Sequence, residues 1–295
     1  MKKESFYLES NSDGLKLFVT TIIPKNKPKG IVQFCHGMAE HQTYYYDFMK
    51  YLSNQGYICV INDHRGHGKS VKSKDDYGYF YEETGKYVVE DVYQITKYMK
   101  KKYPKLPVCL FGHSMGSLIV RSYLKNHDQE LTKLIVCGSP SKNPMTGPGV
   151  LLVKLVKLFK GEYYRSKFLN SLALTNEASE KWLSNNKEYI KQYDNDPKTA
   201  FIFTTNGFLN LLRLVQAVYS KKGWQVKKKN LPIFFIAGSD DQIIKSTKKY
   251  RKSMEFLADR GYQNIQYEIY GGLKHAIFMD DKERIYEDVL DFIEE

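Results

Sequence analysis

A short apolar run that leads into a glycine-flanked serine constrains this chain more than any other feature. Residues 108–111 are apolar and strand-like, Gly112-His-Ser-Met-Gly116 follows directly, and residues 117–125 have a helical pattern. Glycine flanks such a serine because a Cβ at either position would collide with the strand or the helix. An ordinary strand-to-helix turn is the alternative, but the strand before and the helix after favour Ser114 as a nucleophile.

A serine hydroxyl needs a base to remove its proton and an acid to orient that base. In α/β-hydrolases, where this strand–turn–helix motif occurs, the acid and then the histidine follow the serine in the chain. Six of the seven histidines precede any acid that could lie after a strand downstream of Ser114. The chain order therefore predicts His275 as the base, in a loop after the strand-like residues 265–270.

The acid is expected where the preceding predicted strand ends. Residues 231–238 form that apolar strand, and Ser239-Asp-Asp-Gln242 follows it. Asp240 and Asp241 are both candidates, because periodicity does not separate neighbours in a turn.

The loop after the predicted strand 30–35 is a candidate oxyanion site. It reads His36-Gly-Met-Ala-Glu-His41. One oxyanion donor comes from the loop after this strand and the other from the residue after the nucleophile. We therefore expect the backbone N–H groups of Met38 and Met115 to hold the oxyanion, and His36 and Glu40 to maintain the shape of the loop.

Two other groups of residues could suggest a metal or a disulfide. Asp63-His-Arg-Gly-His67 follows a predicted strand, but no fourth ligand lies at a recognisable spacing, so a structured loop is favoured. The four cysteines, Cys35, Cys59, Cys109 and Cys137, fall in predicted core strands and form no C-x-x-C pair. The sequence predicts no metal, no disulfide and no cofactor.

Five motifs in order resemble the monoacylglycerol lipase and lysophospholipase group of α/β-hydrolases, also called serine aminopeptidase-like hydrolases. These motifs are His36–His41, Asp63–Ser70, Gly112–Gly116, Gly238–Asp241 and Gly271–His275. The resemblance runs from about Gly30 to the C-terminus, except for the middle third.

The resemblance implies roles that the residues alone leave open. In this family the acid is the third residue after the glycine, which implies Asp241. The same oxyanion pair is implied. The chain departs from the family at Ala276, where an acidic residue often follows the histidine, and this departure concerns the local support of the base.

The alternation of short apolar strands and amphipathic helices predicts an α/β protein with the α/β-hydrolase fold. A mostly parallel central sheet would be flanked by helices on both faces. We expect residues 1–138 and 224–295 to form this core domain. Residues 139–223, where the alternation stops, are expected to form a helical cap (lid) inserted after the sixth strand, above Ser114.

The predicted cap contains two mostly apolar helical segments, residues 150–160 and 201–219. Six of their side chains are candidate walls of an acyl-chain pocket and of a surface that touches lipid. These are Leu151, Leu155, Phe159, Phe208, Leu211 and Leu212. For any one of them, packing within the cap is the alternative, but something apolar must cover the site as a whole.

The net charge of +12, from 45 Lys and Arg against 33 Asp and Glu, could attract nucleic acid or anionic lipid. The basic residues are mostly scattered and no nucleic-acid motif accompanies them, so no nucleic-acid partner is expected. The more specific prediction is that the cap makes transient contact with a membrane or micelle surface. No secretory signal and no membrane-spanning run is apparent, which predicts a soluble, cytoplasmic protein.

Together these features predict a serine carboxylic-ester hydrolase that works through an acyl-enzyme. By resemblance, its substrates are monoacylglycerols or lysophospholipids. A short-chain esterase or a serine aminopeptidase on the same triad is the alternative, because fold and triad do not specify the scissile bond. A non-catalytic protein that uses the same cavity for binding is disfavoured by the complete triad.

Overall fold

The computed structural model describes residues 1–173 and 179–295 of the chain. Within these residues eight strands form one sheet, in the order β1-β2-β4-β3-β5-β6-β7-β8. The strands are β1 Lys2–Glu9, β2 Lys16–Ile23, β3 Gly30–Cys35, β4 Tyr57–Asn62, β5 Val108–His113, β6 Lys133–Cys137, β7 Ile233–Gly238 and β8 Ile265–Tyr270. Strands β3 to β8 run parallel, and the N-terminal hairpin β1–β2 is the antiparallel edge, so the predicted mostly parallel sheet is confirmed.

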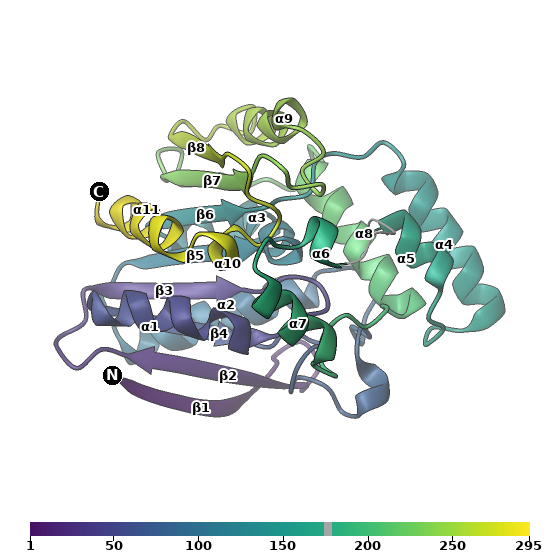
Figure 1. Ribbon diagram of the computed structural model, residues 1–295, viewed down its shortest axis with the longest axis horizontal. Helices are drawn as coiled ribbons and strands as arrows, with labels where there is room; N and C mark the ends of the chain where they lie inside the picture. The colour runs from purple at the N-terminus through teal and green to yellow at the C-terminus, as the bar shows by residue number, and fades with distance from the viewer. Residues whose placement is uncertain (174–178) are drawn as a thin grey trace.

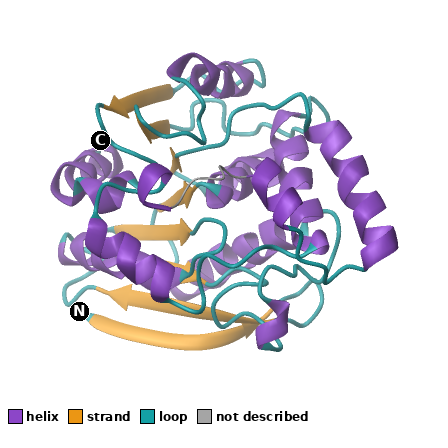
Figure 2. Cartoon of the chain, turned by 45° about the vertical axis from the view of Figure 1, so that its right-hand side comes forward, coloured by secondary structure: helices purple, strands orange, loops and turns teal. Residues whose placement is uncertain are grey.

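Helices cover both faces of this sheet (Figures 1 and 2). The core helices are α1 Tyr46–Asn54, α2 Tyr87–Lys102, α3 Met115–His127, α9 Thr247–Ala258, α10 Ile277–Asp280 and α11 Lys282–Glu294, with short 3-10 turns at Gln42–Tyr45, Lys74–Asp76 and Asp128–Glu130. Among the described helices, none is both long and apolar enough to span a bilayer.

Alternate residues of the central strands belong to two separate cores. In β4, Ile58 and Val60 join the core that contains residues of α2, α3 and α9, whereas Cys59 and Ile61 join the core that contains residues of α1 and α11. Because both faces are buried, these strands are mostly apolar rather than alternating with polar residues. All four cysteines are buried and free in strands β3 to β6, as expected.

A second group of helices lies between β6 and β7. These helices are α4 Thr146–Lys160, α5 Lys167–Ala173, α6 Ser179–Trp182, α7 Lys187–Asn195 and α8 Thr205–Tyr219. They gather beyond the ends to which the β3 and β6 arrows point (Figure 1). Helices α4 and α8 correspond to the two predicted apolar segments. The other three were not predicted, because helices of four to nine residues are too short to show a clear period.

The strand order reverses beside β3. The chain places β4 on one side of β3 and β5 on the other. In open α/β sheets the crevice outside the carboxyl ends of such strands is the usual ligand site. The loop from His36 leaves β3 here and Ser114 leaves β5, so the fold brings two of the predicted site segments together.

A buried ion pair connects the N-terminal hairpin to α2. The Arg65 side chain is 0% exposed. Its Nε donates to Asp91 Oδ2 at 2.8 Å, and its Nη1 donates to Asp13 Oδ2 at 2.9 Å and to the Phe80 carbonyl at 3.0 Å. Arg65 therefore links the Asp13 turn of the hairpin to α2 and to the loop before it.

Replacing Arg65 with Met is expected to lower the free energy of unfolding by about 3–5 kcal/mol, because it leaves the Asp91 carboxylate buried without its partner. Lys29→Met is the matched control, since the Lys29–Glu294 pair lies on the surface with side chains 57% and 43% exposed. Its expected cost is below about 1 kcal/mol. Chemical denaturation of both variants measures the difference, and equal losses would contradict the assignment.

Candidate active site

Ser114 lies at the turn between β5 and α3 in a strained backbone conformation. Its φ is +54° and its ψ is −118°, which a residue with a side chain rarely adopts. The Ser114 N–H donates to the Cys137 carbonyl at the end of β6 (3.0 Å). The predicted strand, tight turn and helix are therefore present around this serine.

The two flanking glycines permit close approach of the backbone. A Cβ on Gly116 would lie 2.1 Å from the Cys35 carbonyl oxygen at the end of β3. A Cβ on Gly112 would lie 2.5 Å from the Gly116 carbonyl oxygen. Because the neighbouring atoms are backbone atoms, neither contact is relieved by moving a side chain.

His275 and Asp241 are in contact. The His275 Nδ1 lies 2.9 Å from Asp241 Oδ2, and both residues are buried. Asp240, the other candidate acid, is exposed, and its Oδ1 accepts a hydrogen bond from Ser239 Oγ. Of the two aspartates left open by the sequence, Asp241 is the one that the fold brings to the histidine.

The serine and the His275–Asp241 pair both lie beside the end of β6. Ser114 bonds to the backbone of Cys137, and the next residue, Gly138, lies beside the pair. A Cβ on Gly138 would be 3.0 Å from His275 Cε1 and 3.3 Å from Asp241 Oδ2. Three residues from distant parts of the chain are thus gathered at the carboxyl edge of the sheet.

The His36 ring orients the peptide that carries the Met38 N–H. His36 Nε2 accepts the His64 N–H (2.9 Å), so the ring proton is on Nδ1, which donates to the Gly37 carbonyl (2.8 Å). In a planar trans peptide the N–H points opposite to the C=O. The Met38 N–H is therefore directed away from the His36 ring.

The loop at residues 36–41 also contacts His67 and Ser114. His67 Nε2 accepts the Ala39 N–H at 3.2 Å, while its Nδ1 donates to the Arg65 carbonyl at 3.0 Å. A Cβ on Gly37 would lie 3.2 Å from Ser114 Cβ. Met115, the other predicted donor, is the first residue of α3.

Burial keeps these loop histidines neutral. It lowers the pKa of His36 well below its ordinary value, with neighbouring His64 and His67 acting in the same direction. Burial also lowers the pKa of His67 to about 4 and that of His64 to about 3. The nearby Asp63 carboxylate accepts the N–H groups of Gln42 (3.0 Å) and Lys69 (2.7 Å). The residues that suggested a metal therefore have structural roles in this loop.

The loop of His275 is bound to helix α6. The Ala276 N–H donates to the Leu183 carbonyl at 2.7 Å, and the His275 N–H donates to the Trp182 carbonyl at 3.4 Å. The centroids of the Trp182 and His275 rings are 5.7 Å apart. Sequence reasoning missed these contacts, because nothing in the sequence around Trp182 marks it as a neighbour of the base.

Asp280 also holds the loop of His275. Its carboxylate accepts the Asn185 N–H at 2.7 Å and the Lys274 N–H at 3.2 Å. Ala276, the position at which the resemblance implied an acid, is buried and bonded through its backbone. Asp280 and α6 therefore hold the backbone on both sides of His275, which is the support that the Ala276 departure had left in question.

The predicted pocket residues fall into two groups. Leu151, Leu155 and Phe159 lie on an exposed face of α4. Phe208 is buried, and Leu211 and Leu212 of α8 pack half-buried against the core. Their part in binding an acyl chain remains a prediction.

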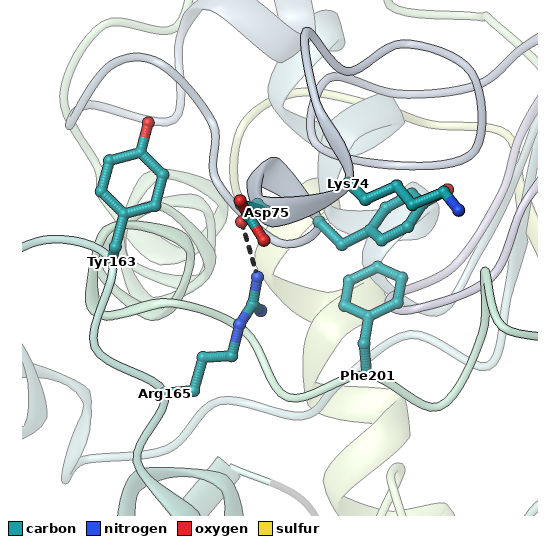
Figure 3. A pocket seen from close by; sticks show the side chains of 6 residues that line it. Lys74, Asp75, Tyr163, Arg165 and Phe201 are labelled. Carbon is teal, nitrogen blue, oxygen red and sulfur yellow. Dashed lines mark hydrogen bonds between the residues drawn. The ribbon is translucent and has the colours of Figure 1, made fainter.

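A cavity of about 450 Å³ lies between the 74–77 segment and the loop segments around residues 163–165 and 201 (Figure 3). It is lined by Lys74, Asp75, Tyr77, Tyr163, Arg165 and Phe201. Arg165 Nη2 donates to the Asp75 carbonyl at 2.8 Å, the bond drawn in Figure 3. None of the lining residues belongs to the predicted triad, although the Phe201 ring lies 5.5 Å from that of His67.

Comparison with known proteins agrees with this fold. A family model described as Serine aminopeptidase, S33 matches residues 26–282, a range that includes all three predicted triad residues. The chain is 28% identical over 276 residues to human monoglyceride lipase (90% of this chain, 82% of the relative). It is 24% identical over 286 residues to the monoacylglycerol lipase of Mycolicibacterium smegmatis (95% and 93%).

The fold also resembles that of a solved enzyme. A thermostable carboxyl esterase from Bacillus coagulans, in complex with glycerol, superposes with a TM-score of 0.88 at 24% identity. The match covers 100% of this chain and 98% of the esterase. This likeness confirms the predicted fold.

Lowering the pH from about 6.5 to 4 is expected to destabilise the protein through its buried neutral histidines. In this window an unfolded histidine binds a proton whereas native His67 does not, so the free energy of unfolding falls as pH falls, by about 1.4 kcal/mol per pH unit for each such histidine. His67→Gln keeps an acceptor for the Ala39 N–H but does not titrate. Denaturation at several pH values should give a shallower slope for this variant, and parallel curves would contradict the expectation.

Proposed function

This chain belongs to the serine aminopeptidase S33 family of α/β-hydrolases, and we propose that within it the chain hydrolyses monoacylglycerol or lysophospholipid-type acyl esters through an acyl-enzyme. It is a serine ester hydrolase. The observation that carries the proposal is the buried His275–Asp241 contact of 2.9 Å, at the sheet edge where Ser114 is held in a strained turn.

In the proposed mechanism Ser114 attacks the ester carbonyl while His275 takes its proton. Asp241 holds the imidazole with Nδ1 protonated, which leaves Nε2 to act as the base. The N–H groups of Met38 and Met115 stabilise the oxyanion of the tetrahedral intermediate. His275 then protonates the leaving alcohol, and water activated by the same histidine releases the fatty acid.

The preference for a lipid ester is supported by two observations. The two relatives described above are named as monoacylglycerol or monoglyceride lipases. The helices beyond the carboxyl edge also carry many apolar side chains. A short-chain esterase or a serine aminopeptidase would use the same triad, and the choice among them depends on the leaving group that the site accepts.

We further propose that α4 and α5 contact a lipid surface. Six large apolar side chains on these helices are 47–78% exposed: Leu151, Leu155, Leu158, Phe159, Phe168 and Leu172. Such a group is unusual on a protein surface that meets only water. The exposed Lys154, Lys160 and Lys167 lie among them and favour an anionic or zwitterionic interface.

Ser114→Ala is expected to lower kcat/KM for a susceptible ester by about 10⁴–10⁶-fold, because the nucleophile is lost. The assay compares p-nitrophenyl esters of increasing chain length with monoacylglycerol, lysophospholipid and aminoacyl substrates. Long-chain glycerol or lysophospholipid esters are expected to have the highest kcat/KM. Asp241→Asn should lose about 10⁴-fold, whereas the matched Asp240→Asn should change kcat/KM little; the reverse order would reject the assigned acid.

Introducing charge on the exposed face should affect aggregated substrate selectively. Leu158→Asp with Phe168→Asp is expected to lower hydrolysis of micellar monoacylglycerol about tenfold relative to a soluble short-chain ester, because two apolar contacts with the interface are lost. Tyr7→Asp, at an exposed position on edge strand β1, is the control. An unchanged ratio of micellar to soluble activity in the double variant would exclude this surface as the contact.

A further inference from the structure

A second buried histidine–carboxylate pair lies beside the proposed triad. His113, the residue before Ser114, and Glu40 are both buried. The His113 Nδ1 lies 3.0 Å from Tyr45 Oη and 3.4 Å from Glu40 Oε1. Tyr45 in turn donates to Glu40 Oε1 at 2.7 Å. The mechanism above uses none of these three side chains.

The hydrogen-bond partners determine where the protons lie. The His113 Nε2 is 3.2 Å from the backbone carbonyl oxygen of His275, which only accepts, so Nε2 carries a proton. Tyr45 gives its single proton to Glu40, so its oxygen accepts from His113 Nδ1. Both ring nitrogens are then donors, and His113 is an imidazolium paired with the Glu40 carboxylate.

The surroundings of Glu40 agree with a charged pair. Burial acts to raise the pKa of this carboxyl group, but the hydrogen bond to His113, the charge of His113 and the hydrogen bonds from Tyr45 and the Gly37 N–H together outweigh burial, and the pKa lies below its ordinary value. An isolated carboxylate in this position would be costly, because a buried charge needs a partner.

The Glu40–His113 pair contacts both the oxyanion loop and the loop of His275. The Gly37 N–H donates to Glu40 Oε1, which fixes the peptide just before the one that carries the Met38 N–H. His113 holds the backbone of His275 through the bond to its carbonyl. The oxyanion loop and the loop of the base, more than 200 residues apart, are therefore connected through two side chains.

The positive charge of His113 also affects the protonation of His275. The centroids of the His113 and His275 rings are 4.7 Å apart. The other groups that face the His275 ring are the Asp241 carboxylate, the Trp182 indole and the Gly138 backbone. An imidazolium at this distance disfavours a second positive charge, whereas Asp241 favours it.

We propose that Glu40, His113 and Tyr45 form a positioning network that holds the oxyanion loop against the loop of the base and keeps His275 in its neutral form. This inference rests on the proposed function, because His275 must be neutral to accept the proton of Ser114. Phe278 packs against the network, and its ring centroid lies 4.9 Å from that of His113.

The test is the pH dependence of kcat/KM in the full chain for a soluble ester. Glu40→Gln keeps an acceptor for Gly37 but removes the charge that retains the second proton of His113. The acid limb of the profile is expected to move to higher pH by at least about half a unit. His113→Gln should move it in the same direction, and the double variant should move it no further than one single variant, because the two residues act as a unit.

A purely structural role would not give this pattern. Thr96→Val is the control, because Thr96 Oγ1 donates to Gln33 Oε1 (2.7 Å) inside the core and away from the site. It should lower stability without moving the pH profile. If Glu40→Gln and His113→Gln lower kcat/KM but leave the acid limb in place, the proposal is wrong.

A readout that needs no activity separates this proposal from the proposed function. Nitrogen-15 spectra of the histidine rings at neutral pH should show two protonated nitrogens on His113 in the native chain and one in Glu40→Gln. Tyr45→Phe, which retains the charge of Glu40, should leave two. A singly protonated His113 in the native chain overturns the proposal even if Ser114→Ala abolishes hydrolysis. An active Ser114→Ala variant would overturn the proposed function alone.

Discussion

The close approach of α3 to the end of β3 is the constraint on which the rest of the site depends. At Gly116 the backbone of the first helical turn lies so near the Cys35 carbonyl that no Cβ fits between them. This contact brings the start of α3, with the Met115 N–H, beside the loop that leaves β3. The strained φ of Ser114 is maintained because β5, β6 and α3 are each anchored in the sheet or its cores.

Hydrogen-bond partners decide the charge of each buried histidine around this point. His36 and His67 each meet one backbone N–H and one carbonyl, so a neutral ring satisfies both partners. His113 meets a carbonyl and a tyrosine hydroxyl beside a carboxylate, which a protonated ring satisfies best. Histidines close together in one site thus adopt different protonation states because their hydrogen-bond partners differ.

The helices between β6 and β7 are connected to His275, the predicted base. Through α6, the Trp182 and Leu183 carbonyls hold the backbone of His275 and Ala276. Asp280 joins the following segment to Lys274. A displacement of α6 would therefore change the position of the His275 imidazole.

The sequence by itself determined the central strands, the turn at Ser114 and the chain order of serine, acid and histidine. These features are local, because apolar periodicity and glycine spacing report the conformation of neighbouring residues. The strand at residues 30–35, buried on both faces, was predicted with its observed ends for this reason.

Only the tertiary structure decided which residues surround the base. Asp240 and Asp241 are equivalent in the sequence by local pattern, and a 2.9 Å contact across 34 residues distinguishes them. The apolar positions of α4 left open whether Leu151, Leu155 and Phe159 pack within the cap or face outward, and the structure exposes all three, because period alone does not say what covers a helix. The contacts of Trp182, Asp280 and His113 with the loop of His275 likewise join segments far apart in the chain, and such contacts leave no signal in local sequence.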